Sequence, residues 1–228
     1  MSFARGKDLE LSKTQVAVAI THGRFGSHTG VVFHTAKDGL QIVHLKFHKM
    51  LTPEPFPPLT HCWIACVVTI PEPASKQLVA FVRAVAKRLP QINFGINFLA
   101  AKGSFDNSGR YSPPRGSDGL TCATFVTELF RWASLPLITE ETWQPRHENI
   151  DWGEAVCKEL ERVGADAHHT ASVRRNINGL RVRPEEVAAA ANMEYVARPV
   201  DYQTAFAGAP AVMASLHSHC PPIAGSLR

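Results

Sequence analysis

The chain alternates between short apolar runs and longer segments with a helical period. The second and third of the short runs flank Ala36-Lys37-Asp38-Gly39, and an Asp-Gly pair in that position is typical of a β-hairpin. Strands are predicted for all the apolar or β-branched runs of strand length, which are residues 16–20, 28–33, 40–45 and 63–70.

Helices are predicted where apolar residues recur every three to four positions. Residues 74–89 show this period and Pro90 ends it, and residues 120–135 repeat it. Ser117 or Asp118 is positioned to cap the start of the second helix. The later part of the chain predicts two further helices, at residues 152–163 and 184–191, and a strand at residues 193–197.

Proline and glycine divide the chain further. The proline run at residues 52–58 excludes a helix or a central strand, residues 103–119 have the composition of a loop, and the tail from Ala207 is expected to fray. The pattern as a whole predicts a mixed α+β chain. We expect a core domain at residues 1–140 and a mainly helical extension, packed on that core, at residues 141–228.

Composition narrows the class of protein. The 228 residues are 45% hydrophobic and 19% charged, which excludes global disorder, and a net charge of +4 is too weak to indicate nucleic-acid binding. No run of apolar residues is long enough for a membrane span, and residues 1–10 lack the apolar stretch of a secretory signal. Five irregularly spaced cysteines do not suggest a disulfide framework. We therefore expect a reduced, cytoplasmic chain, with export by a route independent of a signal peptide left open.

Cys122 is the first candidate for chemistry. It follows a flexible loop and lies in the opening turn of a predicted helix, where unpaired N–H groups and the helix dipole favour a thiolate. The same N–H groups can bind a developing oxyanion. The alternative is a small buried cysteine that packs on the apolar stripe of the helix.

A nucleophilic thiol needs a base, and the base needs a group that orients it. We expect the hairpin that turns within residues 36–39 to place His28 and His44 opposite each other on the same side of the two strands, where one imidazole can orient the other. His34 shares the face of His28 but has no matching partner across the hairpin. The alternative is that both are ordinary strand residues with satisfied hydrogen bonds.

These segments together resemble a known superfamily. Ser27-His28-Thr29-Gly30-Val31-Val32 and Gly39-Leu40-Gln41-Ile42-Val43-His44-Leu45 are similar to the histidine-bearing hairpin of permuted papain-like proteins. That superfamily includes the lecithin retinol acyltransferase-like enzymes and the circularly permuted NlpC-type peptidases. Thr121-Cys122-Ala123-Thr124-Phe125-Val126 resembles their nucleophile helix, although Thr121 and Ala123 replace the Asp and Ser usual in NlpC-type motifs. The similarity covers roughly residues 15–135.

The resemblance implies a papain-like antiparallel sheet packed against helices and a cysteine hydrolase or acyl transferase. Cys122 would form a thioester, His28 would act as base, and His44 would orient His28. Tyr111 would be a second oxyanion donor beside the Cys122 N–H. The implied reaction is cleavage of an amide in peptidoglycan or a peptide, as in a cell-wall hydrolase exported as an antibacterial effector, with an inhibitor or delivery protein as partner. No cofactor or metal is expected.

Two other functions stay open. One is a lipid acyltransferase or phospholipase with the same triad, which an exposed apolar anchor near the site would favour. The other is a non-catalytic interaction module, which slow alkylation of Cys122 would indicate.

Other groups of residues carry weaker signals. Cys62 and Cys66 are expected to pack in the core, and His168-His169 is expected in a solvated loop. The segment His217-Ser218-His219-Cys220 contains zinc-type ligands but has no obvious second half. Four arginines of one basic stretch are interpreted as a solvated face: Arg174, Arg175, Arg181 and Arg183.

Overall fold

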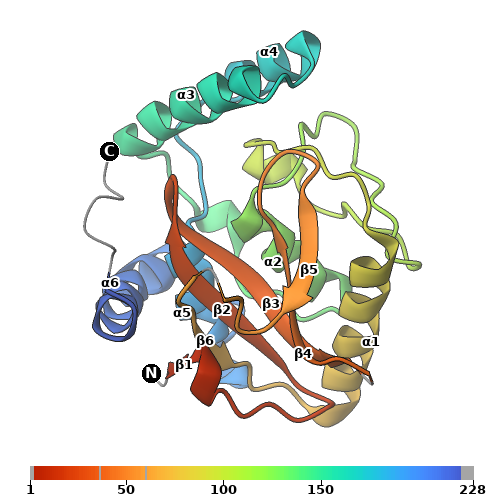
Figure 1. Cartoon of the computed structure of the whole chain (residues 1–228). Coiled ribbons are helices and arrows are strands. Elements are labelled where there is room, and N and C mark those ends of the chain that lie inside the picture. The colour runs from red at the N-terminus through yellow and green to blue at the C-terminus, as the bar shows by residue number, and fades with distance from the viewer. Residues whose placement is uncertain (1–2, 36, 60, 222–228) are drawn as a thin grey trace.

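A six-stranded antiparallel sheet forms the centre of the molecule. The structure is a computed structural model that describes residues 3–35, 37–59 and 61–221 (Figure 1). The strands lie in the order β1-β6-β2-β3-β4-β5. Their bounds are β1 Ala4–Arg5, β2 Val16–Gly23, β3 Gly26–Thr35, β4 Gly39–Leu45, β5 Leu51–Pro55 and β6 Ile64–Val67. The fold is therefore α+β, with neighbouring strands all antiparallel.

Within the described residues, six α-helices and four short 3-10 turns accompany the sheet. The helices are α1 Glu72–Arg88, α2 Cys122–Trp132, α3 His147–Arg162, α4 Ala167–Arg175, α5 Pro184–Ala191 and α6 Tyr202–His219. The 3-10 turns are η1 Gly6–Asp8, η2 Phe98–Ala100, η3 Glu140–Thr142 and η4 Tyr195–Ala197. None of the helices in the described ranges is both long and apolar enough to cross a membrane.

Side-chain alternation gives the sheet two different faces. Val18, Val31 and Val43 point into the large core that the sheet shares with α1, α2 and α5. Ala19, Val32 and Ile42 point to the other face, into a smaller cluster around Trp63. The large core also contains residues from the C-terminal helices. Hydrophobic packing is therefore continuous across residue 140.

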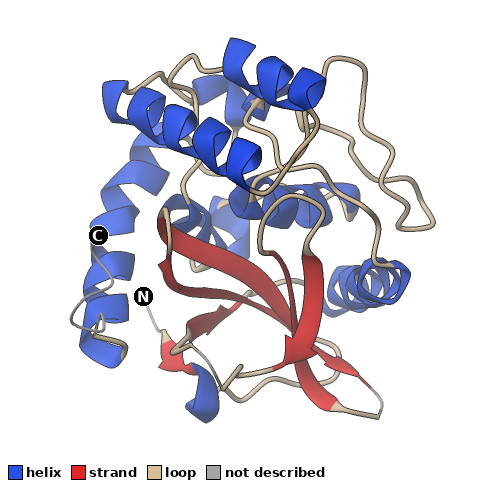
Figure 2. Ribbon diagram, turned by 45° about the horizontal axis from the view of Figure 1, so that its top comes forward, coloured by secondary structure: helices blue, strands red, loops and turns tan. Residues whose placement is uncertain are grey.

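The helices α3 and α4 form a separate pair beyond one end of the sheet (Figures 1 and 2). Arg24 in the β2–β3 turn forms an ion pair with Glu159 of α3, so this end of the sheet is in contact with the helical pair. The cavity described below opens between them.

The hairpin and the first three predicted strands are confirmed, and the strand predicted at residues 63–70 is confirmed for residues 64–67. β3 pairs with β4 from Thr35↔Gly39 onward, and Gly39 has the positive φ of 72° that the turn requires, while Ala36 of the predicted turn lies outside the described residues. The proline run forms β5, which is an edge strand. Pro53 and Pro55 are tolerated there because an edge strand leaves one side of its backbone unpaired.

Several predictions for the part of the chain after residue 140 are wrong. Residues 207–219 of the tail do not fray, because they belong to α6, which Asp201 caps and which packs against α5. His168-His169 lies in α4, capped by Asp166, and residues 193–197 contain a 3-10 turn in place of a strand. The helix predicted at residues 152–163 begins earlier, at His147. Pro222 and Gly225 of the tail lie outside the described residues.

The prediction of a fully reduced chain is also wrong. Cys62 and Cys220 form a disulfide that joins the segment before β6 to the end of α6. The two residues are 158 positions apart, and only the return of α6 to the sheet brings them together. Cys62 is exposed rather than packed in the core, whereas Cys66, Cys122 and Cys157 are free thiols.

Candidate active site

Cys122 is the first residue of α2, which confirms its predicted place in the opening turn of a helix. The helix is capped by Thr121, whose hydroxyl accepts the Thr124 N–H at 3.1 Å, while the Thr124 hydroxyl accepts the Thr121 N–H. The predicted caps are wrong, because the Asp118 carboxylate instead accepts hydrogen bonds from the Asn97 N–H and the Asn176 amide. The reciprocal threonine cap fixes the start of the helix and with it the position of the thiol.

The sulfur of Cys122 lies against the edge of β3. Burial raises the pKa of the thiol, while hydrogen bonds from the backbone N–H groups of Thr29 and Ala123, together with the positive charge of Arg181, oppose that rise. The sequence predicted a lowered pKa from the helix start alone. The structure shows the opposite direction of the pKa shift, because the desolvation of the thiolate outweighs these opposing effects. Cys122 therefore carries a neutral thiol at neutral pH.

His28 and His44 are joined by a hydrogen bond of 2.7 Å between Nε2 of His28 and Nδ1 of His44. Their predicted register is wrong by two residues: Val31 pairs with Val43, so that Gly30, rather than His28, is in line with His44. The two histidines are diagonal neighbours on one face of the sheet, a separation that long or aromatic side chains can bridge.

Gly30 makes this diagonal contact possible. A Cβ atom at position 30 would lie 2.7 Å from the Cβ of His44 and 2.9 Å from the Val43 carbonyl oxygen, closer than real side chains approach. The missing side chain leaves the space across which the two imidazoles meet. The glycine in Thr29-Gly30-Val31 is therefore part of the site.

Glu54 extends the hydrogen-bonded chain, and sequence reasoning missed it. Its Oε1 lies 2.8 Å from Nε2 of His44, and its carboxylate also pairs with Lys46. Glu54 belongs to the proline run, and pairing of Ile42 with Glu54 places it diagonally beside His44. The sequence feature that could have identified Glu54 is that it is the only carboxylate in a short run of residues able to form an edge strand.

The hydrogen bonds between Glu54 and His44 and between His44 and His28 determine which nitrogen of each imidazole carries the proton. The Glu54 carboxylate accepts a hydrogen bond, so Nε2 of His44 donates and its Nδ1 accepts. Nδ1 of His44 then accepts the Nε2–H of His28. The remaining nitrogen of His28, Nδ1, is left with a lone pair that can take a proton.

Both imidazoles are neutral. Burial lowers the pKa of His28 to about 3, helped by the neighbouring His44, and burial likewise lowers the pKa of His44 to about 3. Trp63 contributes to this dry environment, because its ring packs edge-on against both histidines. A neutral His28 is in the protonation state that a general base requires.

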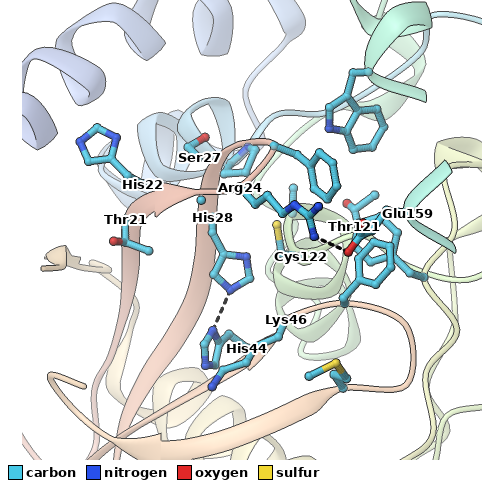
Figure 3. Close-up of a pocket in the computed structure, with 18 of the residues that line it drawn as sticks. Thr21, His22, Arg24, Ser27, His28, His44, Lys46, Thr121, Cys122 and Glu159 are labelled. Carbon is cyan, nitrogen blue, oxygen red and sulfur yellow. Dashed lines mark hydrogen bonds and ion pairs between the residues drawn. The ribbon is translucent and has the colours of Figure 1, made fainter. Parts of the chain in front are cut away.

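The thiol and the imidazole approach each other around the edge of β3. The body of α2 packs on the large-core face, whereas His28 points to the Trp63 face. A strand N–H lies in the plane of the sheet, so the sulfur that accepts the Thr29 N–H is at the edge between the faces. Figure 3 shows the sulfur beside the His28 ring. No hydrogen bond joins the two side chains among those of the described residues, and such contacts often tighten only when substrate binds.

A cavity of about 390 Å³ surrounds these residues. Cys122, His28 and His44 all line it, so the structure brings three of the four predicted site residues together. Much of the remaining lining is apolar or aromatic, and it includes Phe25, Phe47, Met50, Phe94, Trp152 and Val182. The volume is within the range of small-molecule sites.

The segment after residue 140 contributes directly to this cavity. Trp152, Glu159 and Arg162 of α3 line it, together with Pro184, the first residue of α5, and Arg181 in the segment before that helix. The sequence placed Arg181 on a solvated face, which is wrong, because the residue is partly buried and stacks on the Trp152 ring.

Tyr111 does not line the cavity. Its ring packs on Phe105, its hydroxyl is bonded to Ser117, and burial raises its pKa to about 12. The structure therefore gives no geometric support for Tyr111 as an oxyanion donor. His34 is bonded to the Leu11 carbonyl, away from the cavity.

The described residues contain no group of three or more His, Cys, Asp or Glu side chains arranged to hold a metal ion. Cys220, one of the zinc-type ligands in the tail, is in the disulfide.

No protein-family model, no curated protein and no solved structure matches this chain.

Proposed function

We propose that this chain is a cysteine hydrolase or acyl transferase that forms a thioester on Cys122. The observation that carries the proposal is the continuous series Glu54–His44–His28, which ends in the free Nδ1 of His28 at the cavity that the thiol of Cys122 also lines. A nucleophile, a base and a group that orients the base are the elements that covalent acyl transfer requires.

In this mechanism the thiol proton moves to Nδ1 of His28 while the sulfur attacks a carbonyl carbon. The resulting imidazolium is stabilised through His44 by the Glu54 carboxylate, and it then gives its proton to the leaving amine or alcohol. Water, or another acceptor, loses a proton to the same nitrogen and releases the acyl group from sulfur. The N–H groups of Thr29 and Ala123 reach the sulfur itself and support the thiolate.

The leading substrate class remains an amide in peptidoglycan or a peptide, as the family resemblance implies. One observation favours the second class, a lipid acyl ester. The cavity is lined by several aromatic and aliphatic side chains, and two of its lining residues, Met50 and Val163, are 51% and 44% exposed. Exposed apolar residues at the mouth of a site are suited to contact with an acyl chain.

The Cys62–Cys220 disulfide bears on where such an enzyme works. Disulfides persist in oxidising compartments, so the bridge favours the exported alternative over a reduced cytoplasmic chain.

Parallel assays on peptidoglycan fragments, peptides and phospholipids test the proposal, with Cys122→Ala as the control. Turnover of one class by the wild type and not by the folded variant is expected. Equal turnover by both proteins would mean that the chemistry lies elsewhere. A folded wild type that turns over none of the three, with Cys122 slow to alkylate, would favour a non-catalytic module.

A further inference from the structure

Arg181 differs from the other cations that line the cavity. Arg24 and Arg162 both pair with Glu159, and Lys46 pairs with Glu54. No carboxylate of the described residues lies within 4 Å of the Arg181 guanidinium. Arg181 is also less exposed to solvent than the two other arginines of the cavity. The side chains of Arg24 and Arg162 are 62% and 61% exposed, whereas Arg181 is partly buried.

The guanidinium of Arg181 is held in place without a counter-ion. Its central carbon lies 3.7 Å from the centre of the Trp152 ring, so the planar group stacks on the indole. Burial lowers the pKa of Arg181 to about 10, which leaves it charged at neutral pH. Glu185 is close enough to oppose that shift, but its carboxylate accepts a hydrogen bond from the Ser27 hydroxyl.

The same guanidinium is close to the nucleophile. The charges of Arg181 and Cys122 each influence the pKa of the other group, and both residues line one cavity. A partly desolvated cation is costly unless an anion pairs with it, and a fixed guanidinium is suited to bind the two oxygens of a carboxylate or phosphate. The open side of Arg181 therefore fits an anionic group of a bound molecule.

We infer that Arg181 is a substrate-binding residue that selects molecules with an anionic oxyacid group, a carboxylate or a phosphate, next to the scissile carbonyl. The inference rests on the proposed function, since it assigns the charge of the substrate of the same site. The specificity comes from the C-terminal segment, because Arg181 and Trp152 both lie beyond residue 140.

Two alkylating reagents of different charge test this inference without knowledge of the substrate. Iodoacetate carries a carboxylate and iodoacetamide is its neutral analogue. The rate of Cys122 alkylation by iodoacetate, divided by the rate with iodoacetamide, is measured by peptide mapping. This ratio is expected to fall at least about tenfold in Arg181→Gln, which corresponds to about 1.4 kcal/mol. Arg181→Lys keeps the charge and loses the planar fork, so an intermediate ratio is expected.

Arg162→Gln is the matched control. It removes one positive charge from the same cavity, but that guanidinium is exposed and already paired with Glu159. Its ratio is expected to stay within about twofold of the wild type, since exposed charges are screened by solvent. An equal fall of the ratio in Arg162→Gln would mean that any positive charge in the cavity has this effect, and it would overturn the assignment to Arg181.

A binding experiment decides between the two anions and does not depend on thiol reactivity. Octanoate, octyl phosphate and neutral octanamide are titrated into the full chain by calorimetry. At least one anion is expected to bind about tenfold more weakly to Arg181→Gln than to the wild type, with octanamide unchanged. Loss for octanoate alone indicates a carboxylate, and loss for octyl phosphate alone indicates a phosphate.

The two proposals fail in different ways. An unchanged alkylation ratio, with neither anion preferring the wild type, would overturn the role of Arg181 and leave the Cys122 chemistry standing. Anion binding that depends on Arg181, in a protein whose Cys122 resists both reagents, would support the binding site and contradict the hydrolase. A melting curve for each variant confirms that it is folded.

Discussion

At the scale of single residues, Cys122 and His28 start as a neutral pair. Burial raises the pKa of the thiol and lowers the pKa of the imidazole to about 3, so neither group is charged near neutral pH. A preformed thiolate–imidazolium pair would need both shifts in the opposite direction. In the proposed mechanism, His28 therefore takes the thiol proton during the attack rather than before it.

The alkylation of Cys122 by iodoacetamide should consequently rise with pH. Below a raised thiol pKa the thiolate fraction grows about tenfold per pH unit, so the rate is expected to keep increasing from pH 6 to pH 9. Cys122 should still label before Cys66 and Cys157, which are buried with raised pKa values. Mass-spectrometric mapping after brief labelling measures both effects. A plateau below pH 7 would indicate an ion pair instead.

Substitutions along the hydrogen-bonded series should have graded effects on turnover. Cys122→Ala is expected to abolish it, and His28→Ala to reduce it about 10²- to 10⁴-fold, since the base is lost. His44→Ala and Glu54→Gln should be milder, because they orient the base without replacing it.

The kcat and KM of each variant provide the measurement, with thermal melts to confirm folding. The Glu54→Gln variant should lower kcat and leave KM close to the wild-type value. A Glu54→Gln enzyme with unchanged kcat would remove Glu54 from the series.

The sequence alone identified those candidate site residues whose proposed roles follow from their place in a single helix or strand. Cys122 begins a helix and His28 lies on a hairpin strand, and both features are readable from periodicity and an Asp-Gly turn. Glu54 was not found, because its role depends on the edge strand that a proline run forms. Arg181 was not found either, because its place in the cavity depends on the packing of segments that are far apart in the chain.

At the scale of elements, the start of β3 controls how the histidines meet. Gly30 is the position where a side chain would push His44 away, and the cavity lies where β3 and β4 separate beyond Val31. The turn was predicted at the correct residues, but direct pairing of His28 with His44 is two residues out of register, because Thr35 pairs with Gly39. A shift of two residues keeps each side chain on the same face, so the two histidines still meet.

Gly30→Ala tests this arrangement. The added methyl group is expected to displace His44, reduce turnover about 10²-fold by misplacing the base and destabilise the fold by about 1–3 kcal/mol through overpacking. Turnover at saturating substrate and denaturant unfolding are the two measurements.

Val32→Ala on the same face is the control for this variant. It should also lower the free energy of unfolding, because it opens a cavity in the Trp63 cluster, but it should retain turnover. Equal loss of activity in both variants would indicate that general destabilisation, rather than the displacement of His44, is responsible.

At the scale of the whole molecule, the C-terminal segment completes the site and is fastened to the sheet. α5 packs on β2, β3 and α2, and α6 packs on α5. The disulfide then joins the end of α6 to the residue next to Trp63, which contacts both histidines. The sequence predicted an extension packed on the core, but it gave no sign that α6 returns to the sheet, because the packing of α6 depends on partners far away in the chain.

Removal of the disulfide should lower the stability of the fold. A bridge between residues 158 positions apart restricts the unfolded chain strongly, and its loss in a Cys62→Ser, Cys220→Ser double variant is expected to cost about 2–4 kcal/mol. Guanidinium unfolding with and without reductant measures the change. A wild type whose unfolding midpoint is insensitive to reductant would argue against the bridge.

The most direct measurement is mass spectrometry of the acyl-enzyme. The protein is mixed with an activated ester, such as p-nitrophenyl octanoate, and quenched in acid, and the acylated peptide is mapped. We predict one octanoyl group on Cys122 in the wild type, none at this position in Cys122→Ala, and formation at least about tenfold slower in His28→Ala. Acylation of another residue, or acylation of Cys122 at the same rate without His28, would contradict a thioester mechanism based on these two side chains.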